Sequence, residues 1–112
     1  MFTSLNDLHP YLATCAELLS ADGINDAVEL MATADSRIEE TGYDNWNGGT
    51  KIFTIYLSIL PTDFSKIGSK REQIEEHINK RLKTVLETHT SDWYAVKIVP
   101  RVGSGKTKLA VM

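Results

Sequence analysis

The chain has 112 residues and carries 12 lysines and arginines against 15 aspartates and glutamates, a formal net charge of −3 with neutral histidines. Its 42% apolar and 24% charged residues fit one small globular domain and exclude a strongly disordered chain. The single cysteine excludes a disulfide scaffold, and the mildly acidic balance excludes a general nucleic-acid binder, which needs a basic surface.

The expected location follows from the amino-terminal pattern and the cysteine. The first residues show neither the basic region nor the unbroken apolar run of a signal peptide, and no apolar run approaches the ~20 residues that cross a bilayer. Cys15 falls on an apolar stripe with helical spacing, which predicts a buried, unreactive thiol. We therefore expect a cytoplasmic protein that binds other proteins and not membranes, with nucleic acid disfavoured and a small-molecule ligand left open.

The amino-terminal part of the chain predicts a helical hairpin. Apolar residues recur at steps of three and four through the first twenty residues, which places them on one helical stripe. Pro10 interrupts this stripe and favours a helix start at that residue, because the first helical turn tolerates proline. After a break at Gly23, we expect a second helix over residues 24–39, and both helices need a surface that covers their apolar stripes.

A loop and a strand follow the hairpin. Residues 41–50 read TGYDNWNGGT, and glycine, asparagine and aspartate in this density are typical of a loop. Residues 51–60 predict a strand that ends at Pro61, since β-branched and aromatic residues dominate it. Its alternation separates an apolar face (Phe53, Ile55, Leu57 and Ile59) from a more polar one (Ile52, Thr54, Tyr56 and Ser58).

The carboxyl-terminal half predicts one helix and one further strand. Ser69 and Glu72 have the spacing of a capping box, which predicts a helix over residues 70–88. A second strand is expected over residues 93–99, ended by Pro100, so that strand, helix and strand form a βαβ unit with parallel strands. The apolar stripe expected on this helix consists of Ile74, Ile78, Leu82 and Val85.

The predicted fold is a small α+β or α/β domain of order ααβαβ, in which the helical hairpin packs on a small sheet. Residues 1–101 form the domain, and residues 102–112 form a tail that is either flexible or an edge strand. Two strands rarely make a stable sheet. A third has to come from the tail, from residues assigned to the loop or from another chain, and this shortage favours a partner or a homo-oligomer.

The loop that contains two large aromatic residues is the predicted binding site. Exposed aromatic rings act as rigid anchors at interfaces, and neighbouring polar side chains offer hydrogen bonds. Trp46 could instead pack back onto the helical hairpin, and the two roles are compatible. The predicted binding residues are Tyr43, Asp44, Asn45, Trp46, Asn47 and, on the adjoining strand, Tyr56.

This loop and the elements after it resemble a small amino-terminal domain of bacterial abortive-infection (AbiJ-type) phage-defence proteins. The matching pieces are residues 43–50, the strand residues 54–57, the charged helix and the segment 93–100. The resemblance implies a non-catalytic module that senses an infection cue or couples it to an effector. It supplies no active-site residues, and only the loop carries over as a binding surface.

The expected function is therefore a non-catalytic protein-binding or sensor module of a bacterial defence or conflict system, which docks through residues 43–50 or an exposed sheet edge. An alternative is an antitoxin or immunity protein that covers the basic site of a toxin. A third, less favoured, is a metal-independent ribonuclease, because the spacing of Arg71 and His77 resembles a motif of the HEPN ribonucleases. No catalytic residue, metal site or cofactor is predicted.

Overall fold

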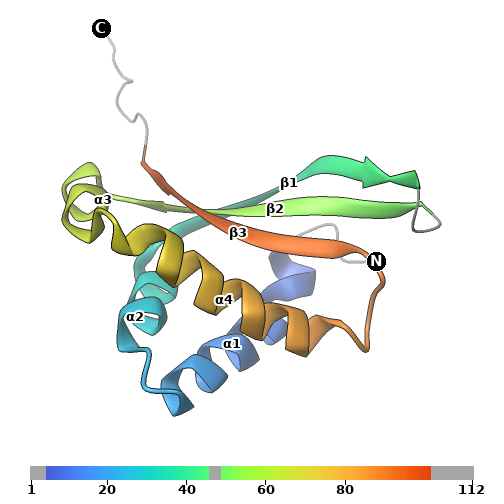
Figure 1. Ribbon diagram of the computed structural model, residues 1–112, viewed down its shortest axis with the longest axis horizontal. Helices are drawn as coiled ribbons and strands as arrows, with labels where there is room; N and C mark the ends of the chain where they lie inside the picture. Colours follow the sequence, from blue (N-terminus) through green and yellow to red (C-terminus); the bar gives the residue numbers. More distant parts are fainter. Residues whose placement is uncertain (1–4, 46–48, 102–112) are drawn as a thin grey trace, which may run out of the picture.

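The computed structural model describes residues 5–45 and 49–101, which form a three-stranded mixed sheet with helices against one of its faces (Figure 1). The small α+β fold is thereby confirmed. The elements in chain order are α1 (Leu5–Ala21), α2 (Asn25–Thr33), β1 (Asp35–Asp44), β2 (Thr50–Ile59), α3 (Pro61–Ile67), α4 (Lys70–Leu86) and β3 (Trp93–Pro100). No helix in these ranges is long and apolar enough to cross a membrane.

The third strand lies within the chain, in a region predicted as the end of a helix and a loop. The second helix ends at Thr33, and the backbone of Ala34 is already extended (φ −76°, ψ 146°). β1 then pairs antiparallel with β2, and Ile38 lies opposite Ile55. Pairing with an apolar central strand overrides the local helical pattern, as is usual for strands. Of the three sources considered for a third strand, the residues assigned to the loop supply part of it, since β1 includes residues 41–44. The shortage of strands therefore no longer argues for a partner.

The βαβ unit is confirmed, with β3 parallel to β2 and Val96 opposite Ile55. Its connection also contains α3, which the sequence reasoning missed and which begins with Pro61 in the first helical turn. The prediction of a capping box at the start of α4 was wrong. Ser69 makes no side-chain bond to the helix and has a helical backbone (φ −69°, ψ −14°), whereas a capping residue needs an extended backbone to turn its oxygen onto the amides.

α1 continues through Pro10, so the prediction that it begins there was also wrong. Leu8 and Cys15 are completely buried on either side of the proline, which itself lies on the exposed side of the helix. Burial of this stripe compensates for the hydrogen bond that the proline cannot make.

The core lies between the sheet and α1, α2 and α4. All four residues of the predicted apolar face of β2 are buried. On α4 the buried residues are Ile74, Ile78, Leu82 and Leu86, and the predicted Val85 is half-buried. Outside the core, Arg81 of α4 donates two hydrogen bonds of 2.7 and 2.6 Å to Asp22, which tie the turn between α1 and α2 to α4.

Candidate functional site

The predicted loop residues lie at the far end of the β1–β2 hairpin. Tyr43 and Asp44 are the last residues of β1, not of a loop, and Asn45 follows them. The Tyr43 side chain is 57% exposed. Trp46 and Asn47 lie outside the described residues, as does the predicted tail 102–112. The end of β1 therefore presents an accessible aromatic ring.

Tyr56 does not join this cluster, because it pairs with Arg37, far along β1 from Tyr43, and because a β-bulge turns Tyr43 to the other face of the sheet. The register of β1 shifts between Glu40 and Gly42, so that Tyr43 lies opposite Lys51. Without the extra residue, Tyr43 would share a face with Tyr56. The two tyrosines thus lie on opposite faces, and a single flat partner surface cannot contact both.

Tyr56 lies in the middle of the sheet face that the helices leave uncovered (Figure 1). The Arg37 guanidinium lies 4.1 Å from the centroid of the Tyr56 ring and also forms an ion pair with Glu39. At one end of this face Trp93 lies opposite Ile52, and its side chain is 60% exposed. The sequence reasoning missed Trp93 as a surface residue. The alternation of Tyr94, Val96 and Ile98 with Ala95 and Lys97 in the sequence is the signal that could have placed Trp93 on the exposed face.

The outer edge of β3 is capped by side chains of α4. The N–H of Val96 donates to Asn79 Oδ1 and the N–H of Ile98 to Glu75 Oε2, each at 2.7 Å. Pro100, the next residue whose backbone faces outward, has no N–H. Another strand would have to displace these side chains before it could pair with this half of β3, so the edge is protected against strand addition.

The outer edge of β1 has no such protection. The Ile59 carbonyl faces β3, where it accepts from the Arg101 N–H at 2.6 Å. Backbone groups alternate in direction along a strand, so those of the preceding residue, Ser58, face β1 and its partner Asp35. The same alternation along β1 turns the amides of Ser36 and Ile38 outward, away from β2. Within residues 35–43, no backbone amide is capped by a side chain of the described structure. β1 is also mostly exposed along its ten residues, with Ile38 half-buried against the core.

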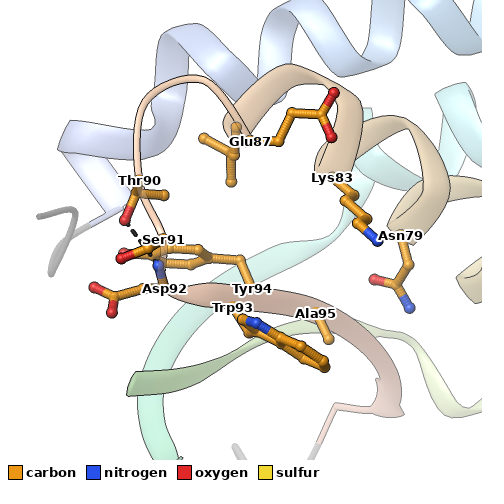
Figure 2. Close-up of a pocket in the computed structure, with 10 residues that line it drawn as sticks. Asn79, Lys83, Glu87, Thr90, Ser91, Asp92, Trp93, Tyr94 and Ala95 are labelled. Carbon is orange, nitrogen blue, oxygen red and sulfur yellow. Dashed lines mark hydrogen bonds between the residues drawn. The ribbon is translucent and has the colours of Figure 1, made fainter. Parts of the chain in front are cut away.

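A groove of about 330 Å³ opens where α4 ends and β3 begins (Figure 2). Leu86 and Tyr94 are its buried apolar residues, and Trp93 and Ala95 line it from β3. Its polar residues are Asn79, Lys83, Glu87, Thr90, Ser91 and Asp92. The groove thus combines an aromatic wall with side chains of both charges.

The remaining candidate groups are occupied in structural contacts. Cys15 is completely buried, its Sγ donates to the Ile78 carbonyl at 3.7 Å, and burial raises its pKa to about 11, so the thiol is unreactive at neutral pH. Arg71 is paired with Glu75 at 3.5 Å, and His77 projects about 120° away from it around the helix at 3.6 residues per turn. The two residues of the ribonuclease hypothesis therefore do not converge.

Among the residues that the structure describes, no three His, Cys, Asp or Glu side chains are grouped so that they could hold a metal ion. Comparison of the chain with protein-family models, with curated proteins and with solved structures finds no match.

Proposed function

We propose that this chain is a non-catalytic protein-binding module whose partner adds an extended strand to the outer edge of β1. The difference between the two edges of the sheet carries this proposal. α4 caps the outward amides of Val96 and Ile98, whereas those of Ser36 and Ile38 have no cap among the described residues. Strand addition at an open edge supplies main-chain hydrogen bonds, and side-chain pockets supply selectivity.

The side chains along β1 indicate what kind of strand fits. Ile38 is only half-buried, so an apolar residue beside it in the added strand would extend the core. β1 carries four acidic side chains and one basic one, a net charge of −3. Pairing of two copies would bring two acidic strands together, while a strand with lysines or arginines would be attracted. These charges are exposed and act mainly on the association rate.

The hairpin end contributes to recognition in this proposal. A strand added along β1 and extended beyond Asp44 passes close to Tyr43, whose exposed ring offers an aromatic contact at the end of the edge. Tyr56 on β2 is separated from the added strand by β1, and Trp93 on β3 lies at the opposite edge of the sheet, so neither is part of this contact.

We further propose, on the sequence resemblance to the amino-terminal domain of AbiJ-type proteins, that the module acts in a bacterial defence system in the cytoplasm and connects a cue to an effector. The acidic character of β1 also favours the second hypothesis, an immunity protein that covers a basic toxin site. An immunity protein would form a salt-sensitive one-to-one complex with a toxin, whereas strand addition depends mainly on backbone amides.

Selection from a displayed random heptapeptide library on the purified full chain tests the proposal. Ser36→Pro removes one outward amide and leaves the β1–β2 pairing intact, while Ser36→Ala changes the same side chain and keeps the amide. We expect selected peptides to bind the wild type and Ser36→Ala alike, and to lose at least about fivefold in affinity with Ser36→Pro, about 1 kcal/mol for one hydrogen bond. Peptides that bind all three proteins equally, or an absence of selected peptides, would refute strand addition at β1.

A further inference from the structure

The groove between α4 and β3 has the dimensions and the lining of a small-molecule site, independently of the β1 edge. Its volume of about 330 Å³ lies at the lower end of the range for ligand pockets in proteins. It lies between the end of α4 and the start of β3, next to the Val96 amide that Asn79 caps.

The apolar part of the groove fits a flat ring. Leu86 and Tyr94 are 4% and 9% exposed and form its inner surface. Trp93 is 60% exposed and lines the groove from the start of β3, with its indole lying along that strand in Figure 2. An exposed indole at the open side of the groove offers a stacking surface to an aromatic ligand.

The polar part of the groove offers hydrogen-bond donors. The Oδ1 atom of Asn79 accepts from the Val96 N–H, so the Nδ2 group is the end of that amide which is left for a ligand. No carboxylate in the described part of the chain lies within ion-pair distance of Lys83. Lys83 and Asn79 lie on neighbouring turns of α4, and both project toward β3 (Figure 2).

The two acidic residues of the groove do not cancel this arrangement. Asp92 accepts a hydrogen bond of 3.0 Å from the Lys51 N–H, and its carboxylate lies at the end of the groove away from Lys83 and Asn79 (Figure 2). The Glu87 carboxylate lies on the rim opposite Trp93 in the same view. The side of the groove next to the indole therefore carries the positive charge of Lys83.

We infer that this groove binds a small planar aromatic molecule with a carboxylate, the ring stacked on Trp93 and the carboxylate held by Lys83 and Asn79. A matched pair of probes tests the inference: 2-naphthoate, which has the ring and the charge, and 2-naphthamide, which keeps the ring without the charge. Nitrogen–proton NMR spectra of the full chain report binding through the side-chain amide of Asn79 and the indole N–H of Trp93.

We expect 2-naphthoate to shift both signals and to bind about fivefold more tightly than 2-naphthamide, the upper limit for one exposed ion pair. Lys83→Gln should remove this difference by weakening the binding of 2-naphthoate alone. Lys97→Gln, which removes a lysine from the uncovered face of β3, should leave the difference unchanged. Equal affinities for the two probes, no binding of either, or equal effects of the two lysine variants would overturn the inference. None of these outcomes depends on the β1 edge.

Discussion

The two edges of the sheet differ in what lies beside them. α4 runs along β3, and Asn79 and Glu75, one turn apart on that helix, reach its outward amides. β1 follows α2 after a single residue, Ala34, and no helix of the described structure runs along its outer edge (Figure 1). The crossover helix of the βαβ unit thus protects one edge as it packs on the sheet. The strand outside that unit is left available for pairing.

The largest effect is expected where α4 is held against the sheet. Ile78 is completely buried, so Ile78→Ala should lower the free energy of unfolding by about 2–5 kcal/mol, measured by urea denaturation. Lys80→Ala, at an exposed position two residues away, should stay within about 0.5 kcal/mol of the wild type. If both variants lost a similar amount of unfolding free energy, Ile78 would not hold α4 against the sheet, and the packing on which the capped edge depends would be contradicted.

The caps themselves should have the next largest effect. Asn79→Ala leaves the Val96 amide without its partner, which should lower the free energy of unfolding by about 1–3 kcal/mol. Asn79→Asp keeps the accepting oxygen and should recover most of that loss. Thermal or urea unfolding of the two variants decides the matter: equal destabilisation would mean that the bond to Val96 contributes nothing.

The ion pair that ties α4 to the α1–α2 turn makes stability depend on pH. The hydrogen bonds from Arg81 hold the pKa of Asp22 below its ordinary value of 3.8. A carboxyl whose pKa is lower in the folded than in the unfolded state stabilises the fold above its ordinary pKa, and this contribution is lost as the pH falls through the folded value.

The stability difference between the wild type and Asp22→Asn should therefore be constant near neutral pH and shrink below about pH 3.8, in urea titrations at several pH values. Because both partners are accessible to solvent, the difference should also fall at high salt. If the stability difference between the wild type and Asp22→Asn were unchanged at pH 2, Asp22 would stabilise the fold by an interaction that does not depend on its charge.

The smallest effect is expected on β1. Arg37→Ala removes the contact with the Tyr56 ring and the pair with Glu39, both exposed, so it should cost no more than about 1 kcal/mol. A much larger loss of unfolding free energy in urea denaturation would mean that the side chains of the open edge stabilise the isolated chain and are not available to a partner.

The sequence predicts the parts of the fold with strong periodicity. The alternation of β2 and the apolar stripe of α4 are buried on one side, and local pattern is enough to recognise them. β1 has no such pattern, because Ile38 is its single half-buried large aliphatic residue. Its strand conformation comes from pairing with β2, which a local pattern does not contain.

The candidate site was predictable to a lesser degree. The loop-like surroundings drew attention to Tyr43, which is exposed, but its position on the opposite face of the sheet from Tyr56 depends on one bulge that the sequence does not reveal. The roles of Asn79 and Glu75 depend on the register between α4 and β3, since an asparagine or a glutamate on a helix is ordinarily a solvated residue. Such contacts follow from the packing of distant elements and appear only in the assembled fold.

Amide hydrogen exchange of the native chain, resolved by residue with NMR, tests the difference between the edges most directly. We expect slow exchange at Val96 and Ile98, whose amides are bonded to Asn79 and Glu75, and fast exchange at Ser36 and Ile38. Equal protection of the two pairs would contradict this expectation: if both were slow, the β1 edge would already be covered, and if both were fast, the caps on β3 would not hold.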